Sequence, residues 1–325
     1  MKRLSAIILA LCLMLSACAA KQEDSGEENL TVVGISQVGA ESDWRVANSE
    51  SMKGAFTEEK GYRLLFSDAR QKQDNQIMAV RKFIQQQVDY IVLMPLCETG
   101  WDSVLREAKE AGIPVILVDR MAQVSDDSLY AAHVGSDFYG EGKRAVEWME
   151  SRYASRVDTV DIIHIQGTLG STAQLGRTQA LEEAAASHAG WRIVTQLDGD
   201  FTQAKTYEVL GNYLDTMPKG QNIDVVYCEN DNEAFGAIEA LQERGYRLGL
   251  DVDVICFDGT KKALELCMDG KIALVLECNP LLGPLAEEIV RTLEAGNVPP
   301  KQNYIDEQMF TRWDLNEEII AEREY

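Results

Sequence analysis

The sequence predicts an α/β protein with two parallel β-sheets, each covered by helices on both faces. Ten short apolar runs alternate with longer stretches whose apolar residues recur at helical spacing, which is the pattern of β-α units. One sheet of ten strands would be very wide, and 325 residues are enough for about two domains. The polar stretch 151–158 directly precedes the sixth run. We therefore expect two doubly wound parallel-sheet lobes, side by side.

Each apolar run is a predicted strand, because it is only six to eight residues long and is followed by a helical pattern. The ten predicted strands cover 31–36, 62–67, 90–95, 114–119, 131–136, 159–166, 191–197, 224–229, 253–258 and 272–277. The helical patterns lie near 44–60, 73–87, 101–111, 138–153, 172–188, 203–216, 231–244, 260–269 and 281–295. Glycines such as Gly112 and Gly270 end a helix before the next strand, as expected for left-handed helix caps.

The N-terminus predicts export from the cytoplasm. Lys2 and Arg3 precede an apolar run from Leu4 to Leu15, which is too short to span a membrane comfortably. This charge and length pattern is typical of a secretory signal peptide.

The end of that signal resembles the lipobox of bacterial lipoproteins, in which acyl chains are attached to a cysteine. The tetrad is Leu-Ser-Ala-Cys, ending at Cys18. We expect residues 1–17 to be removed, Cys18 to be lipidated, and the polar residues 18–29 to form a tether at the outer side of the membrane. An ordinary secretory signal with an incidental cysteine is the alternative.

Charge and cysteine content exclude several classes of protein. Residues 1–17 contain two cations and no acid, so their removal changes the net charge from −22 to −24. Nucleic acid and anionic lipid would repel so acidic a chain. Five cysteines remain outside the signal, none at metal-finger spacing, and most lie in apolar runs. We expect no disulfide-built fold, no metal site and no cofactor.

Polar and aromatic residues follow nearly every predicted strand, where open parallel sheets bind their ligands. The first such turn lacks the glycine spacing of a nucleotide-binding loop and instead contains Glu41, Trp44 and Arg45. The later strand ends supply Asp119, Arg120, Asp137, Arg177, Phe201, Asn230, Asp258 and Glu277. Carboxylates, guanidinium groups and amides hydrogen-bond sugar hydroxyls, and aromatic rings cover the C–H faces of a sugar. The residue types therefore favour a sugar as the ligand.

The order of these motifs resembles the periplasmic sugar-binding proteins of ABC transporters, of the type I, ribose- and galactose-binding-like class. The motifs, in chain order, are SQVGAESDWR, RQKQDNQ, IPVILVDR, SDFYGEGK, QGTLGSTAQLGR, GDFTQAK, ENDNEAFGAIEAL and FDG. The resemblance covers about residues 30–300 and is greatest to galactofuranose-binding members, notably through SQVGAESDWR, RQKQDNQI and TGWDSVLREAKEAGIPV. Any one motif is weak evidence, whereas eight in one order are specific.

This resemblance implies two lobes joined by a three-stranded hinge, with a monosaccharide held between them. It places residues 30–136 and 278–308 in the N-terminal lobe, and residues 137–277 and 309–325 in the C-terminal lobe. The residues that it brings to the ligand are Glu41, Ser42, Trp44, Arg45, Asp119 and Arg120 from the first lobe, and Arg177, Phe201, Asn230, Asp258 and Glu277 from the second. We also expect Asp43, in the first turn, and Asp137, at a strand end, to bind the ligand. Ribose binders have an amide at the position of Glu277, so this departure favours a different hydroxyl pattern.

Several of these residues also have a purely structural interpretation. Trp44 lies eight residues before Met52 on about the same helical face and could belong to the core. Asp119 and Arg120 could form a local ion pair of little energetic value. Arg177 could line a solvated helix face, and Asp258, before a glycine, could be a turn residue. Asn230 and Asp231 are both suited to cap the helix that follows, and we expect mainly that role for Asp231.

The resemblance implies an ABC permease as partner, a monomer, and a location in the cell envelope, with no nucleic-acid partner. A sensor that presents its closed form to a chemotaxis receptor or a histidine kinase is the alternative. Catalysis is not expected, because His133 and His164 lie inside strands, His188 lies at a helix end, and no G-x-S-x-G motif is present. The arginines among the strand-end acids suit binding better than glycoside hydrolysis.

Overall fold

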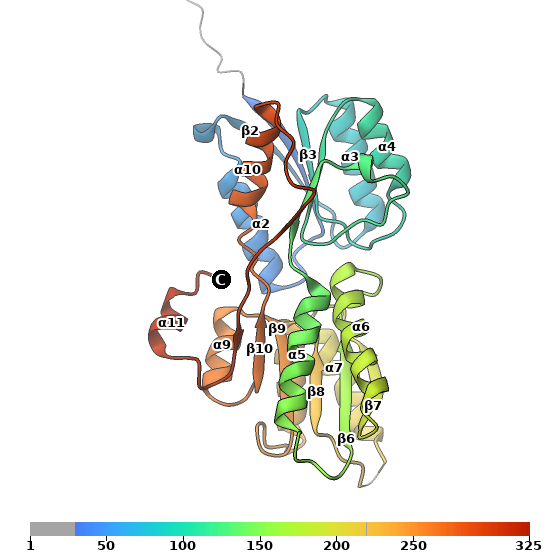
Figure 1. Ribbon diagram of the computed structural model, residues 1–325, viewed down its shortest axis with the longest axis vertical. Helices are drawn as coiled ribbons and strands as arrows, with labels where there is room; N and C mark the ends of the chain where they lie inside the picture. The colour runs from blue at the N-terminus through green and yellow to red at the C-terminus, as the bar shows by residue number, and fades with distance from the viewer. Residues whose placement is uncertain (1–29, 219) are drawn as a thin grey trace, which may run out of the picture.

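The computed structural model describes residues 30–218 and 220–325 and confirms two α/β lobes, one above the other in Figure 1. The predicted signal, Cys18 and the tether lie outside the described residues. Each lobe contains one six-stranded sheet. No helix within the described ranges is long and apolar enough to span a membrane.

The N-lobe sheet has the order β11-β5-β4-β3-β1-β2, and all its strand pairs are parallel. Its strands are β1 (Thr31–Gln37), β2 (Tyr62–Asp68), β3 (Tyr90–Leu93), β4 (Val115–Val118), β5 (Ala132–Gly135) and β11 (Gln302–Tyr304). Its helices are α2 (Asp43–Ala55), α3 (Gln73–Gln85), α4 (Asp102–Glu110) and α10 (Gly283–Glu294), with short 3-10 turns at Glu58–Lys60 and Asp127–Leu129. Helices α2 and α10 cover one face of the sheet, and α3 and α4 cover the other.

The C-lobe sheet has the order β12-β10-β9-β8-β6-β7, in which only β12 is antiparallel to its neighbour. Its strands are β6 (Val160–Gln166), β7 (Trp191–Asp198), β8 (Val225–Cys228), β9 (Asp253–Asp258), β10 (Leu274–Glu277) and β12 (Met309–Phe310). Its helices are α5 (Phe138–Arg152), α6 (Thr172–Ser187), α7 (Gln203–Thr216), α8 (Asp231–Glu243), α9 (Lys261–Met268) and α11 (Glu317–Glu322). All ten predicted strands are therefore present.

The chain crosses between the two sheets three times, and these crossings form the hinge. They run from β5 to α5, from β10 to α10 and from β11 to β12. The sequence did not predict β11, β12 or α11, because the two strands are only three and two residues long and carry no apolar alternation. The helix predicted to reach residue 60 ends at Ala55, and a 3-10 turn follows it.

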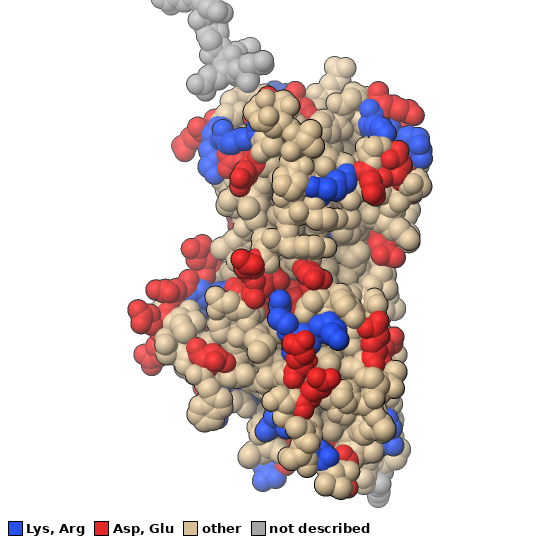
Figure 2. All heavy atoms as spheres, in the orientation of Figure 1, with Lys and Arg blue, Asp and Glu red and all other residues tan. Residues whose placement is uncertain are grey.

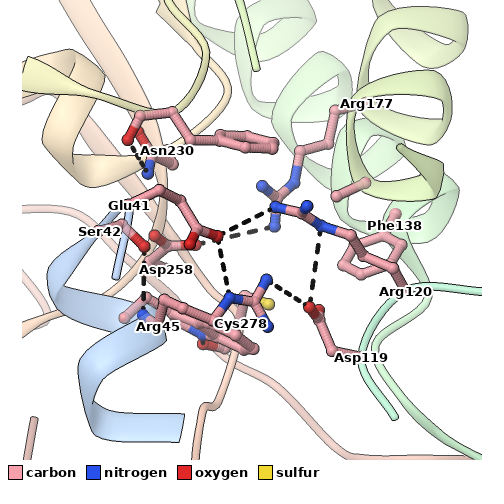
Figure 3. Close-up of a pocket in the computed structure, with 13 residues that line it drawn as sticks. Glu41, Ser42, Arg45, Asp119, Arg120, Phe138, Arg177, Asn230, Asp258 and Cys278 are labelled. Atoms are coloured by element: carbon pink, nitrogen blue, oxygen red, sulfur yellow. Dashed lines mark hydrogen bonds and ion pairs between the residues drawn. The ribbon is translucent and has the colours of Figure 1, made fainter. Parts of the chain in front are cut away.

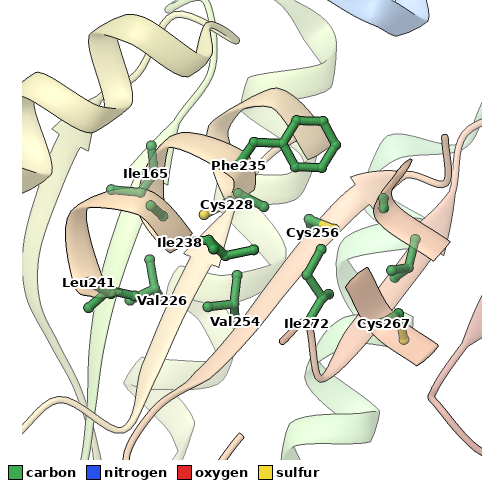
Figure 4. Packing of buried hydrophobic residues seen from close by; sticks show 14 of the residues in the cluster. Ile165, Val226, Cys228, Phe235, Ile238, Leu241, Val254, Cys256, Cys267 and Ile272 are labelled. Carbon is green, nitrogen blue, oxygen red and sulfur yellow. The ribbon is translucent and has the colours of Figure 1, made fainter. Parts of the chain in front are cut away.

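Buried aliphatic side chains hold each sheet between its helices. In the C-lobe, residues of β8 and β9 pack against α8 and α9, and three cysteines lie among them (Figure 4). Cys228, Cys256 and Cys267 are fully buried there as free thiols, and the apolar sequences around Cys228 and Cys256 indicated this for those two. Such packing on both faces explains why the strands have near-continuous apolar sequences.

Helix α10 meets α2 so closely that only glycine fits at the contact. A Cβ atom on Gly283 would lie 2.2 Å from the backbone oxygen of Ser51, and the Gly283 N–H donates to Ser51 Oγ at 3.0 Å. The second crossing therefore enters the N-lobe through a helix that is fixed against α2 at its first residue.

Acidic side chains are prominent on the surface. On the face drawn in Figure 2 they gather over α11 and beside the waist between the lobes. Glu317, Glu318, Glu322 and Glu324 are the exposed acids of the α11 segment. The surface thus carries the negative charge that the composition indicated.

Candidate functional site

A cavity lies between the lobes at the carboxyl ends of the strands (Figure 3), with about 290 Å³ of empty space when the part open to solvent is included. Its lining comes from both lobes and consists of Glu41, Ser42, Trp44, Arg45, Asp119, Arg120, Phe138, Ala173, Arg177, Phe201, Asn230, Asp258 and Cys278. Ten of the thirteen predicted site residues are among them. The position agrees with the rule that open α/β sheets bind ligands beyond their strand ends.

The start of α2 brings Trp44 and Arg45 to this cavity. Ser42 caps the helix by accepting a hydrogen bond from the Arg45 backbone N–H at 3.1 Å, which fixes the first turn. The Trp44 indole N–H donates to the carbonyl oxygen of Cys278 at 2.5 Å, and the Arg45 guanidinium lies 4.6 Å from the indole centroid. Trp44 is thus both buried, as the structural interpretation held, and part of the cavity wall.

The N-lobe half of the cavity is an ion network. Arg45 Nε contacts Glu41 Oε1 at 2.9 Å, and Arg45 Nη2 contacts Asp119 Oδ2 at 2.6 Å. Arg120 Nη2 lies 3.3 Å from Glu41 Oε1. All four side chains are almost fully buried, so Asp119 and Arg120 do not form a surface pair.

Burial and neighbouring charges act differently on the two arginines of this network. Burial opposes the charge of Arg45, but Asp119 and Glu41 together outweigh it and raise the pKa of Arg45. For Arg120, burial and then the positive charge of Arg45 lower the pKa. Both remain cations at neutral pH, because an arginine starts from so high a pKa.

Three polar atoms of the network have no hydrogen-bond partner among the described residues. Asp119 Oδ2 lies in close ion-pair contact with Arg45, whereas Glu41 Oε2, an acceptor, and Arg120 Nε, a donor, have no contact that short. An unpaired buried polar atom costs about 1–3 kcal/mol. A ligand that supplies a hydroxyl to each would satisfy both, since a hydroxyl both donates and accepts.

Arg177 is the corresponding cation of the C-lobe half. Its Nε donates to Glu141 Oε2 at 2.7 Å, its Nη1 donates to the carbonyl of Glu229, and its Nη2 lies 3.9 Å from Asp258 Oδ1. The guanidinium lies 5.3 Å and 4.6 Å from the ring centroids of Phe138 and Phe257. Arg177 is therefore not on a solvated helix face.

Three cavity residues that follow strands have left-handed backbone conformations. The φ angles are 63° at Asp119, 59° at Phe201 and 106° at Asp258. Such conformations cost about 1–3 kcal/mol each for a non-glycine residue and occur preferentially at functional sites. Close packing supports them, since a Cβ on Gly167 would lie 2.0 Å from the Phe201 ring.

Asn230 caps α8, as predicted, and its side chain also lies at the cavity. Its side chain accepts from the Glu233 backbone N–H at 2.8 Å, and Glu233 accepts in return from the Asn230 backbone, which completes a capping box for α8. The Asn230 amide also lines the cavity and donates to the carbonyl of Phe201 at 3.2 Å. Asp231, the first residue of α8, is buried behind it.

Three predicted residues lie outside the cavity. Asp43 is exposed at the cleft rim, where its backbone N–H donates to Asn232 Oδ1 of the other lobe at 3.1 Å. Asp137 is exposed and caps α5 by accepting from the Gly140 N–H at 2.9 Å. Glu277 turns away from the cavity and accepts from the backbone N–H of Gln308 and the hydroxyl of Tyr325, each at 3.0 Å, and from Arg323.

Phe138, Ala173 and Cys278 line the cavity but were not predicted. Cys278 directly follows the tenth strand, so the strand-end rule alone would have found it. Phe138 is the first residue of α5, and Ala173 is the second residue of α6. With Trp44 and Phe201, these three residues form one apolar cluster around the cavity.

Hydrogen bonds join the lobes across the cleft, so the described conformation is closed. The Glu98 N–H donates to the carbonyl oxygen of Gly170 at 2.9 Å, and the Met121 N–H donates to Thr172 Oγ1 at 2.9 Å. Arg120 of the N-lobe also lies 5.1 Å from the Phe201 ring centroid of the C-lobe. The cavity is therefore enclosed by contacts that opening of the lobes would break.

A group of three side chains near the hinge is close enough to share a small ion. One oxygen each of Glu141 and Glu307 and the Cys278 sulfur lie within 4.8 Å of one another. Their oxygens already have partners in the protein, since Glu141 bonds Arg177 and Glu307 accepts from the Ser136 hydroxyl and the Asn279 backbone N–H. We therefore assign no metal to this group, the one such cluster in the described part of the chain.

Residues 33–297 match the family model described as periplasmic binding protein domain. The chain belongs to this family. Its two parallel-sheet lobes have the type I periplasmic binding protein fold.

The most similar relatives include proteins named for furanose sugars. The galactofuranose-binding protein YtfQ of Escherichia coli K12 is 36% identical over 89% of this chain and 90% of its own. A Mycobacterium smegmatis structure in complex with β-D-fucofuranose is 39% identical, with a TM-score of 0.83 over 87% of this chain and 91% of that one. The arabinose transporter component of Shewanella sp. ANA-3, bound to L-arabinofuranose, is 38% identical, with a TM-score of 0.82 over 90% and 93%.

Proposed function

We propose that this chain is the solute-binding lipoprotein of an ABC sugar importer and that it captures a monosaccharide in its furanose form. The observation that carries the proposal is the closed cavity, in which buried arginines and carboxylates face an apolar wall of aromatic rings. The relatives named for galactofuranose, fucofuranose and arabinofuranose support a furanose, with galactofuranose first.

The charges of the cavity favour a neutral sugar. The ionisable side chains that line it, apart from the Cys278 thiol, are Glu41, Asp119 and Asp258 with Arg45, Arg120 and Arg177. Equal numbers of acids and arginines leave no excess charge for a sugar acid or an amino sugar. Neutral hydroxyl groups would instead pair with Glu41 Oε2 and Arg120 Nε, which have no hydrogen-bond partner among the described residues.

The permease would recognise the closed conformation of the lobes. A sugar that bonds residues of both lobes favours the closed conformation, and the cleft-spanning hydrogen bonds add to that preference. We further propose that a lipid on Cys18 keeps the protein at the outer side of the membrane, that it acts as a monomer and not as an enzyme, and that the lobe boundaries are those predicted from the sequence.

Calorimetry against galactofuranose, arabinose, ribose and galactose tests the ligand class. We expect binding of a furanose, with galactofuranose strongest. Failure of every pentose and hexose to bind would reject the sugar assignment. Stimulation of the cognate permease ATPase by the sugar-loaded protein would support import, whereas its absence, with kinase or receptor activation in its place, would favour the sensor.

Arg45→Ala and Trp44→Ala test the N-lobe half of the site. Each variant removes a group that lines the cavity and should weaken sugar affinity by tenfold or more, which corresponds to about 1.4 kcal/mol. Arg106→Ala, an exposed arginine on α4, is the matched control and should bind normally. Circular dichroism must show both variants folded; if both unfold, the first turn serves the core and not the ligand.

A further inference from the structure

One carboxyl group outside the cavity connects all three hinge crossings. Glu307 lies on the third crossing, and its Oε1 accepts from the Ser136 hydroxyl of the first crossing at 2.6 Å. The same oxygen accepts from the Asn279 backbone N–H of the second crossing at 2.9 Å. Rotation about any crossing must therefore disturb the surroundings of this carboxyl group.

A second carboxyl group, that of Glu141, lies against the first. Glu141 is fully buried on α5, and its Oε2 accepts from the cavity residue Arg177. Its Oε1 has no hydrogen-bond partner of nitrogen or oxygen among the described residues. One carboxylate oxygen of Glu141 lies within 4.8 Å of an oxygen of Glu307 and of the Cys278 sulfur. Two carboxylates this close in a dry interior repel each other unless one of them is protonated.

The charged and titratable groups around this pair do not supply enough positive charge for two carboxylates. Arg177 on α6 is shared with the Glu229 carbonyl and Asp258 at the end of β9. Arg144 on α5 is 3.9 Å from Glu307 Oε2, beyond hydrogen-bond distance. The Cys278 thiol and, on β8, the Tyr227 hydroxyl complete the ionisable surroundings, and neither is a cation.

The surroundings of both carboxyl groups favour a retained proton. Burial, and then the charge of Glu141, raise the pKa of Glu307 from its ordinary 4.5 to about 8. Burial also raises the pKa of Glu141, although Arg177 opposes this. For an acid with a raised pKa, the stabilisation is present at low pH and is lost as the pH rises through the folded value.

We propose that Glu141 and Glu307 share one proton in the closed conformation and that closure of the lobes takes this proton up. Opening the hinge separates the pair and admits water, so the proton is released near neutral pH. Low pH therefore favours the closed form. For sugar capture this rests on the proposed function, because Glu141 positions the Arg177 guanidinium at the cavity.

Glu307→Gln is the central variant, since an amide keeps an acceptor for Ser136 and Asn279 but cannot titrate. Calorimetry of sugar binding at pH 7 in buffers of different ionisation enthalpy counts the protons taken up. We expect uptake approaching one proton for the wild type and much less for Glu307→Gln. Wild-type affinity should fall between pH 6 and pH 9, by up to tenfold for each unit by which closure shifts the pKa, and the variant should lose little. Exposed Glu50→Gln should behave as the wild type.

A sugar-free measurement separates this proposal from the assignment of the ligand. Small-angle scattering of the full protein should show a smaller radius of gyration at pH 6 than at pH 9, and Glu307→Gln should abolish that difference. If no sugar binds but this pH-dependent compaction is seen, the hinge proposal stands and the sugar assignment fails. Equal proton uptake in wild type and variant, or equal compaction at both pH values, would overturn the hinge proposal.

Discussion

The two halves of the cavity meet the same ligand space with different electrostatics. In the N-lobe half, two arginines and two carboxylates form direct contacts of 2.6 to 3.3 Å. In the C-lobe half, Arg177 alone faces Asp258 and Glu141, and Asp231 is buried behind them. The first half is balanced by fixed charges, whereas the second has more carboxyl groups than cations.

This difference assigns different tasks to the halves. Burial, and then the charge of Asp231, raise the pKa of Asp258, and burial raises that of Asp231 to about 6. The carboxyl groups of Asp258 and Asp231 therefore bind protons more readily than ordinary aspartates do. We expect the N-lobe half to recognise the hydroxyl pattern of the sugar and the C-lobe half to make binding and stability depend on pH.

The largest predicted effect is that of Arg177→Met. This change leaves Glu141 and Asp258 without their cation, so the free energy of unfolding should fall by about 3–5 kcal/mol. Urea denaturation at pH 7 measures the loss. Arg45→Met is the matched change in the other half and should cost less, because Arg120 remains beside Glu41. Equal losses would contradict the proposed difference between the halves.

The second prediction concerns a disulfide engineered between the two lobes. A Cβ on Gly170 would lie 4.0 Å from the Cβ of Cys97 across the cleft, within the range of natural disulfides. Gly170→Cys, oxidised after sugar is added, should stabilise the closed form by about 2–4 kcal/mol and slow release by roughly 30-fold or more. Reduction should restore the rate, and Cys97→Ser in the same chain should prevent the lock. Unchanged release from the oxidised protein would mean that the lobes do not separate here.

The third and smallest effect is on pH dependence. Asp231 Oδ2 accepts from the Thr260 N–H and hydroxyl, each at 2.7 Å. Because the pKa is raised, stability present below the ordinary value of 3.8 is lost as the pH rises through about 6. Between pH 4 and pH 7.5 the free energy of unfolding should fall by about 2 kcal/mol more in the wild type than in Asp231→Asn, as measured by urea unfolding. Exposed Asp158→Asn is the control. A variant that loses as much stability as the wild type would show that Asp231 holds no proton.

The sequence was sufficient for the sheets and for most of the cavity lining, for a physical reason. Parallel strands covered on both faces need apolar runs, and polar side chains at their carboxyl ends are costly unless they have partners there. Arg45, Asp119 and Arg177 could be placed by this reasoning, although their ligand contacts remain predictions.

The misplaced residues depended on contacts that spacing does not contain. Asp43, Trp44 and Arg45 follow one another on the first turn of α2, yet the Asp43 side chain is exposed and the other two line the cavity, which depends on how the helix packs. Glu277 is held by Arg323 and Tyr325, which lie far along the chain. Strand β11 pairs with β5 through exposed polar residues, which give no apolar signal.

The contact between Gly283 and Ser51 has a consequence for measurements of lobe motion. Since α10 is fixed directly against α2, both helices must turn together when the hinge rotates. Spectroscopic labels on these two helices will therefore keep a constant separation, and they provide an internal ruler. A label on either helix paired with one on α8 will report the angle between the lobes, free of distortion within the N-lobe.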